Sequence, residues 1–132
     1  MPRNAATYDN LLLLKDAGAV TASGAATVAA SPRVLDLGPA YAGSVRAIVD
    51  NSALDAADAN ETYRVDIQGS NDITFATGVA VLGSITVLAA SARNEAAFSN
   101  NQGDVTYRYV RAFHTLAGTT PSINYTAFVA KD

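Results

Sequence analysis

A solitary histidine limits the chemistry available to this sequence. His114 is the one imidazole among 132 residues, and the chain contains no cysteine. Nucleophilic catalysis needs a base beside the nucleophile and a third group that orients the base. The sequence has no Gly-x-Ser-x-Gly turn and no glycine-rich phosphate loop to supply the other parts. Because His114 falls where a predicted strand approaches a turn, we interpret it as a surface or hydrogen-bonded structural residue, and we expect no enzymatic activity and no cofactor.

Acidic residues form the second grouping that could bind a ligand. Four carboxylates and two amides lie within twelve residues: Asp50, Asn51, Asp55, Asp58, Asn60 and Glu61. Calcium binds six to eight oxygens, so calcium is one interpretation, although the spacing does not match an EF-hand loop. A solvated acidic loop is the interpretation we favour, and zinc is not expected without more histidine or cysteine. Asp66 is the one acid in the middle of a clear strand, and we expect Arg64 on the same face to neutralise it.

The charge balance narrows the classes of partner. The formal net charge is −3, and 16% of residues are charged, against roughly 25% in ordinary soluble domains. No stripe of Lys or Arg is present, so we expect neither nucleic acid nor an anionic membrane as a partner. The low charge indicates either a surface covered by partners or simply an alanine-rich composition. The run Leu11–Leu14 is too short for a membrane span or a signal peptide, so we expect neither export by a cleaved signal nor membrane anchoring.

Alternating apolar residues predict the elements that position these side chains. In 44–51, Val45, Ala47 and Val49 share one face, and 62–68 alternates in the same way. Further short apolar segments cover 8–14, 33–37, 75–82, 84–89, 94–100, 105–115 and 122–130, with a break at Gly83 between the third and fourth. The first, 8–14, could be a short strand or a single helical turn. Turn residues separate them roughly every 8–12 positions, which is typical of a β-sandwich or barrel.

We therefore predict an all-β protein with a single antiparallel β-sandwich domain over 8–132 and an extended N-terminal arm over 1–7. A jelly roll is the favoured topology, and an immunoglobulin-like sandwich is the alternative, because strand number alone does not separate them. The run 105–115 carries apolar residues on both faces, which favours a central strand.

The turn Gln68-Gly69-Ser70-Asn71-Asp72 is similar to strand-turn segments of carbohydrate-binding sandwiches. Sugar recognition usually needs exposed aromatic platforms. The chain has no Trp, and most of its Tyr residues fall at inward positions of predicted strands. We favour a plain turn and keep a carbohydrate- or receptor-binding module as the second functional hypothesis.

Two short motifs resemble the start of the capsid cement (decoration) proteins of tailed phages, the Bbp16-like group. In that group, an apolar LL-x-x-S-D-A-Q-A-V-T segment leads through Ala-, Ser- and Thr-rich sequence into V-I-D-L-G. The matching residues are Asp16-Ala17-Gly18-Ala19-Val20-Thr21 and Val34-Leu35-Asp36-Leu37-Gly38. Lys15 stands where Ser is common, and Gly18 stands where Gln is common. The segment from Val65 to Asp72 also fits the middle strand and turn of the group.

The resemblance implies a jelly-roll-like sandwich without catalysis or cofactor. It implies a virion protein, assembled in the host cytoplasm, that binds the outside of an icosahedral shell as a homodimer or homotrimer. The major capsid protein would be its partner. The rival hypotheses are the sugar- or receptor-binding module and, third, a small enzyme that depends on His114.

The N-terminal apolar segment is the candidate contact site. An aperiodic arm precedes a concentrated apolar patch, so the hypothesis assigns docking or subunit contact to five residues: Tyr8, Leu11, Leu12, Leu13 and Leu14. The equally weighted alternative is that Leu11–Leu14 is an edge strand of the core.

Overall fold

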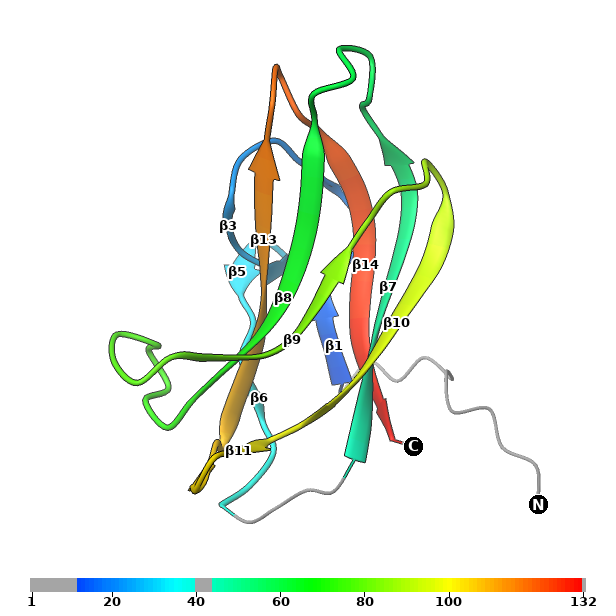
Figure 1. The fold of residues 1–132 in the computed structure, drawn as a ribbon. Coiled ribbons are helices and arrows are strands. Elements are labelled where there is room, and N and C mark those ends of the chain that lie inside the picture. Colours follow the sequence, from blue (N-terminus) through cyan, green and yellow to red (C-terminus); the bar gives the residue numbers. More distant parts are fainter. Residues whose placement is uncertain (1–11, 40–43, 132) are drawn as a thin grey trace, which may run out of the picture.

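The computed structural model describes residues 12–39 and 44–131 of the chain. The described part is built from β-strands that pair antiparallel and form two sheets packed face to face (Figure 1). The predicted all-β antiparallel sandwich is thereby confirmed. The predicted arm over 1–7 lies outside the described residues.

The first sheet has the strand order β1-β14-β7-β10, and β2 also pairs with β14. Its strands are β1 (Leu13–Lys15), β2 (Ala19–Val20), β7 (Ser44–Leu54), β10 (Ala92–Ser99) and β14 (Ile123–Lys131). The β7 strand is central and pairs along its length with β10 and with β14. The N-terminal strands therefore lie at the edge opposite β10.

The second sheet has the order β3-β13-β8-β9, and β6 pairs with another part of β13. Its strands are β3 (Gly24–Ala25), β6 (Leu35–Asp36), β8 (Thr62–Ser70), β9 (Ala80–Thr86) and β13 (Tyr109–Ala117). Two small hairpins complete the described part: β4 (Thr27–Val28) with β5 (Ser31–Pro32), and β11 (Asn101–Gln102) with β12 (Val105–Thr106). The central position predicted for 105–115 is confirmed for β13, which lies between β8 and the short strands β3 and β6. The predicted single strand is split, because Val105 and Thr106 pair with β11 in the hairpin and β13 begins at Tyr109.

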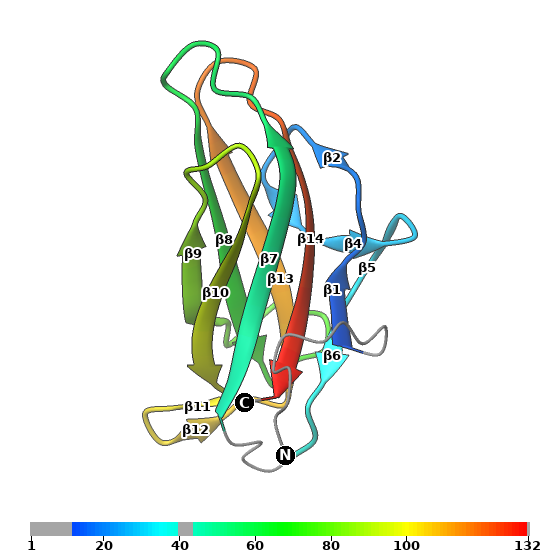
Figure 2. The same ribbon diagram turned by 90° about the vertical axis from the view of Figure 1, so that its right-hand side faces the viewer.

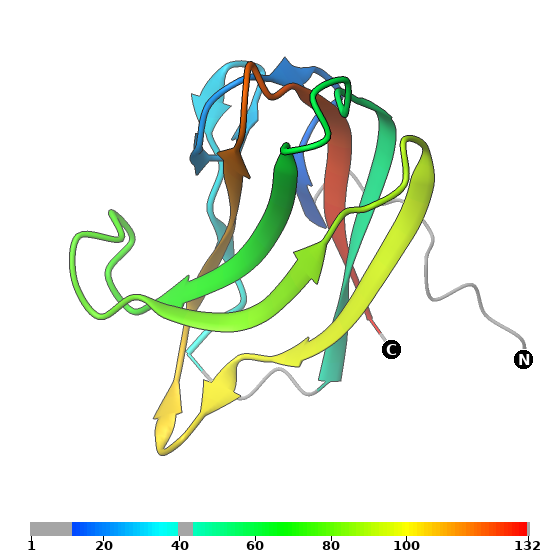
Figure 3. The same cartoon turned by 45° about the horizontal axis from the view of Figure 1, so that its top comes forward.

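The chain crosses between the sheets several times. After β7 it enters β8 and β9, returns to β10, and then crosses to β13 and back to β14. Figure 3 shows β9 and β10 side by side where the two sheets approach each other. At this edge a Cβ on Gly83 would meet the Phe98 Cβ at 3.3 Å, so glycine allows the close approach of the sheets.

Period-two alternation accounts for the core between the sheets. The predicted inward residues Val45, Ala47 and Val49 of β7 are buried in it, as are Tyr63 and the other inward residues of β8. Each large apolar side chain so buried contributes roughly 1.5–3 kcal/mol. A second, smaller cluster lies on the outer face of the first sheet, where the β4–β5 hairpin lies beside β1 (Figure 2). Its members are Leu13, Val28, Ile48, Phe128 and Ala130.

The stretch 75–89 also differs from the sequence prediction. The apolar segments 75–82 and 84–89 were expected to break at Gly83, but β9 runs from Ala80 through Gly83 to Thr86. Residues 71–79 instead form a loop, in which Phe75 has a positive φ of 57° and is buried. The loop folds Phe75 back against the sheet, where the Arg111 guanidinium lies 4.4 Å from its ring centroid.

Candidate functional site

The catalytic candidate His114 is a buried, hydrogen-bonded residue of the core. Its Nδ1 lies 2.7 Å from the Tyr125 hydroxyl, and the two rings meet edge to face at 5.7 Å. Burial and then the positive charge of Lys15 lower the pKa of His114, against a hydrogen bond to the Ala22 backbone that raises it. Burial raises the pKa of Tyr125. A neutral imidazole joined to a neutral phenol inside a packed sandwich serves to connect β13 with β14.

Lys15 completes this buried polar cluster. Its side chain is 3% exposed, and its ammonium donates to three backbone carbonyls, those of Asp16 at 2.8 Å, Gly18 at 2.8 Å and Tyr125 at 2.7 Å. The ammonium also lies 4.4 Å from the Tyr125 ring centroid. All three ammonium protons are therefore used to hold the segment after β1 against β14. Burial lowers the pKa of Lys15, and the charge of Asp16 opposes that shift.

The predicted acidic grouping divides between strand β7 and the β7–β8 loop. Asp50 lies on β7 and accepts two 2.7 Å hydrogen bonds from Arg93. The loop carboxylates accept hydrogen bonds from backbone amides of the same loop: Asp55 from Ala57 at 2.9 Å, and Glu61 from Asp58 at 3.3 Å. Across residues 12–39 and 44–131, no three His, Cys, Asp or Glu side chains lie close enough to hold a metal ion. The calcium interpretation therefore has no geometric support.

The expected neutralisation of Asp66 is confirmed. The Arg64 Nε lies 3.1 Å from Asp66 Oδ1, and the Ser84 hydroxyl donates to the same oxygen at 2.7 Å. Asp66 is 5% exposed. The ion pair with Arg64 and the hydrogen bond from Ser84 therefore offset the cost of burying its carboxylate in β8.

The leucine segment belongs largely to the core, which corrects the docking hypothesis for its described part. Leu14 is fully buried between the sheets, Leu13 is 3% exposed in the outer-face cluster, and Leu12 is half-buried against the main core. Because β1 is an edge strand with both faces covered, Leu13 and Leu14 have no surface left for a partner. The alternative, an edge strand of the core, describes them. Tyr8 and Leu11 lie outside the described residues.

The described part of the chain contains no helix long and apolar enough to cross a membrane.

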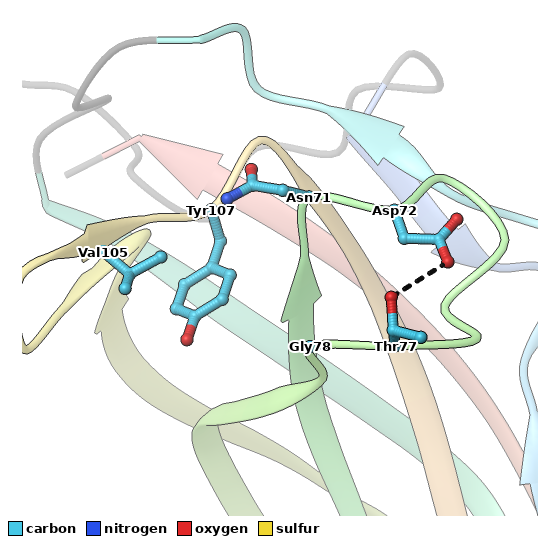
Figure 4. A pocket seen from close by; sticks show the side chains of 6 residues that line it. All are labelled: Asn71, Asp72, Thr77, Gly78, Val105 and Tyr107. Atoms are coloured by element: carbon cyan, nitrogen blue, oxygen red, sulfur yellow. Dashed lines mark hydrogen bonds between the residues drawn. The ribbon is translucent and has the colours of Figure 1, made fainter.

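The structure places a cleft of about 410 Å³ between the β8–β9 loop and the β11–β12 hairpin (Figure 4). Its walls are Asn71, Asp72, Thr77, Gly78, Val105 and Tyr107. The Tyr107 ring and the Val105 side chain face it from the hairpin side. Gly69 of β8 lies beneath Tyr107, because a Cβ there would meet the Tyr107 Cβ at 3.0 Å.

Asp72 fixes the loop that forms one wall. Its carboxylate accepts from the Thr74 amide at 2.9 Å, the Thr74 hydroxyl at 2.6 Å, the Ala76 amide at 3.2 Å and the Thr77 hydroxyl at 3.4 Å. The hydrogen bonds from Thr74 are the main reason that the pKa of Asp72 is lowered. An Asx-type turn of this kind makes the loop stiff without any partner.

The polar side chains of the cleft are already used within the protein. The Asn71 amide donates to the Thr106 carbonyl at 3.1 Å and accepts from the Arg108 amide at 2.9 Å. The Thr77 hydroxyl donates a hydrogen bond to the Asp72 carboxylate. Among the lining side chains, Tyr107 has a hydroxyl without a hydrogen bond to the described residues. The cleft therefore offers mainly shape and apolar surface to a partner.

Exposed apolar side chains flank this cleft. Among the described residues, four of the five large exposed hydrophobic residues lie in its two walls or on β9 directly after them: Ile73 (58% exposed), Val79 (42%), Val81 (47%) and Val105 (42%). We call the six residues that line the cleft, Val105 among them, together with Ile73, Val79 and Val81 the cleft surface. Isolated exposed leucines or valines are ordinary, but a group around a preformed cleft indicates an interaction site.

No protein-family model matches the chain, and no curated protein matches its sequence. The fold and its surfaces therefore carry the functional inference.

Proposed function

We propose that the chain is a capsid cement (decoration) protein that binds the outer surface of an icosahedral phage shell and bridges major capsid protein subunits. The observation that carries this proposal beyond the sequence resemblance is the cleft surface. Its apolar side chains are exposed, while its polar groups are used to hold its own walls. Such a surface favours contact with another protein, because complementarity rather than polar recognition provides the binding energy.

We further infer a jelly-roll topology from the strand orders. The last two long strands, β13 and β14, insert between earlier strands: β14 lies between β1 and β7, and β13 lies between the β3 and β6 strands and β8. The two main strand paths, β1-β14-β7-β10 and β3-β13-β8-β9, have four strands each, and β2 and β6 add a fifth strand to each sheet. Two facing paths of four strands with such nested pairs generate the two Greek keys of a jelly roll, the arrangement found in viral capsid and lectin domains.

The chemistry of the cleft weighs against the sugar-binding alternative. A sugar site presents free hydrogen-bonding groups beside an aromatic platform, whereas Asn71, Asp72 and Thr77 are committed to the loop. Tyr107 alone would have to provide both stacking and polar recognition. A protein partner needs neither.

Multivalency would convert modest contacts into durable attachment. A homodimer or homotrimer on the virion exterior would touch several capsid subunits, so release would require several contacts to break together. One contact of ordinary size buries around 800 Å² per partner. The rigid sandwich keeps its contact surfaces at a fixed separation, as a bridge requires.

The test is co-sedimentation of the purified chain with shells of the phage that encodes it, prepared without the chain. We expect saturable binding at a fixed ratio to the coat protein. The double variant Val79→Glu/Val105→Glu should weaken binding at least tenfold, because it places two charges in the apolar contact. The matched control Ala97→Glu adds a charge at an exposed position of β10 and should bind normally.

Circular dichroism would establish that each variant is folded. Absence of binding by the folded wild-type chain, or full binding by the double variant, would overturn the proposal. Binding to a glycan array in place of shells would favour the sugar-binding alternative.

A further inference from the structure

The β9–β10 loop lies at the other end of the sandwich from the β11–β12 hairpin (Figure 1). It carries the fifth large exposed hydrophobic residue of the described part of the chain. Leu88 is 85% exposed in the β9–β10 loop. The buried side chain of Asn51 holds this loop, since its amide donates to the Ala89 carbonyl at 2.7 Å and the Ala90 carbonyl at 2.9 Å. Asn94 in turn donates to the Asn51 oxygen at 3.3 Å. An exposed leucine on a fastened loop loses little conformational entropy when a partner covers it.

Two neighbouring loops are fastened at the same end. Asn60 and Thr119 exchange two hydrogen bonds, of 3.0 and 3.1 Å, between the β7–β8 and β13–β14 loops. The Tyr63 hydroxyl donates to the Asp55 carbonyl and accepts from the Ser122 amide at 3.1 Å. We call the loops 55–61, 87–91 and 118–122 together the acidic apex.

A small pocket of about 120 Å³ lies beside Leu88 in the acidic apex. Leu54, Val87 and Leu88 supply apolar walls, and Glu61 lines it with a carboxylate. Pockets for whole small-molecule ligands are roughly 300–1,000 Å³. This pocket is of the size for the end of one side chain.

The charge of the apex is of one sign. Asp55, Asp58 and Glu61 lie in its loops, and the three loops contain no Lys or Arg. Burial, together with Glu61 and Asp55, raises the pKa of Asp58, as expected where carboxylates lack a cation. The Glu61 Oε1 is buried and has no hydrogen-bond partner among the described residues. A buried oxygen without a partner is costly, so a donor entering this pocket would find an acceptor already desolvated.

We propose that the acidic apex binds a basic side chain, Arg or Lys, presented by a partner protein. Its methylene stem packs against Leu88, Val87 and Leu54, and its cationic head pairs with Glu61. Charge complementarity selects this occupant: an acidic residue would be repelled, and a purely apolar one would leave the buried Glu61 Oε1 without a hydrogen bond. This inference stands apart from the proposed function, because it concerns the opposite end of the sandwich and holds for any protein partner.

The test is an amide-detected NMR titration of the full chain with three single-residue probes. They are N-acetyl-arginine methylamide, N-acetyl-lysine methylamide and, as the uncharged analogue, N-acetyl-norleucine methylamide. We expect the two cationic probes to shift the Glu61, Val87 and Leu88 amide resonances saturably, and the norleucine probe to bind at least fivefold more weakly. The two cationic arms show which head group fits better. Added salt should weaken the binding of both.

Variants separate the pocket from general acidity. Glu61→Gln should weaken cationic binding at least fivefold, and Leu88→Ser should weaken it through the lost apolar wall. The control Glu95→Gln, which removes an exposed carboxylate of β10, should leave the titration unchanged. Absence of saturable shifts at these amides, equal binding of the norleucine probe, or an unchanged titration in Glu61→Gln would each overturn the proposal. None of these outcomes depends on shell binding, which is measured separately.

Discussion

The buried ammonium of Lys15 should be a principal fastening of the N-terminal segment, and Lys15→Met tests this. The substitution keeps the length and apolar stem of the side chain but leaves three carbonyls without their donor. The Tyr125 carbonyl is part of a buried contact, so losing its partner should cost about 1–3 kcal/mol. The Asp16 and Gly18 carbonyls are less buried and should cost about 0.5–1 kcal/mol each.

Methionine also removes the cost of burying a charge, which limits the total loss. We therefore expect Lys15→Met to lower the free energy of unfolding by roughly 2–4 kcal/mol, a large share of the 5–15 kcal/mol typical of a domain. Urea unfolding followed by circular dichroism measures this as a lower midpoint with an unchanged slope. The matched control is Arg46→Met, which removes a cation from a partly exposed pair with Glu95 and should cost less than about 1 kcal/mol.

The reasoning fails if Lys15→Met unfolds within about 1 kcal/mol of the wild type. That result would mean that water replaces the ammonium at all three carbonyls. It would also fail if the two variants lost the same stability, because the buried geometry would then contribute nothing beyond charge.

Three further predictions concern protonation and backbone strain. Burial and the charge of Lys15 lower the pKa of His114, so the unfolded chain takes up the proton first. The free energy of unfolding should be highest above about pH 6.5, fall by up to about 1.4 kcal/mol per pH unit below it, and level off below the pKa of His114 in the folded chain. Urea unfolding midpoints measured between about pH 7.5 and 5 should show this fall, and His114→Gln should remove most of it. Ala30 has a φ of 64° in the β4–β5 turn; Ala30→Gly should raise the unfolding free energy by about 0.5–1 kcal/mol, and a lower thermal midpoint would contradict this. Gly118→Ala should lower the free energy of unfolding in urea by about 2–3 kcal/mol, because Gly118 has a φ of +107° and the added Cβ would lie 2.6 Å from the Asn60 carbonyl oxygen. An unchanged midpoint would show that the loop rearranges without cost and would refute this prediction.

The long strands could be predicted because their side chains alternate. In β7 and β8 the inward positions are apolar, and the outward ones are mostly polar, so burial between two sheets follows from period two. Gly83 misled the same reasoning, since glycine often ends a strand. Here it continues β9 and permits the close approach to Phe98, a tertiary contact that no local pattern encodes.

The cleft surface could not be predicted from local patterns. Its two walls are more than twenty residues apart in the chain and meet through contacts such as Gln102 to the Val81 carbonyl at 3.0 Å. The apolar pattern predicts Phe75 in a strand. In the structure the Asp72 carboxylate instead accepts hydrogen bonds from Thr74 and the Ala76 amide, and the backbone turns. The Asp72-x-Thr74 spacing was the signal available for that turn. The burial of Lys15 could not be predicted either, because its hydrogen-bond partners are backbone carbonyls, which every residue type has.

The two surfaces have different chemistry, and this difference bears on the proposed bridging role. The exposed side chains of the cleft surface are mainly apolar, and hydrogen bonds within the loop hold the Asp72 carboxylate. This surface therefore suits a packed contact whose strength varies little with salt. The acidic apex is negative and would attract a basic partner over about one Debye length, so its binding would weaken as salt rises. Internal hydrogen bonds through Asp72 and Asn51 fasten each end to the sandwich. If both ends bind, low salt should strengthen attachment through the apex alone, and Val79→Glu/Val105→Glu should make the remaining shell binding more sensitive to salt than that of the wild type. Equal salt dependence of the two would show that the ends do not act as separate contacts.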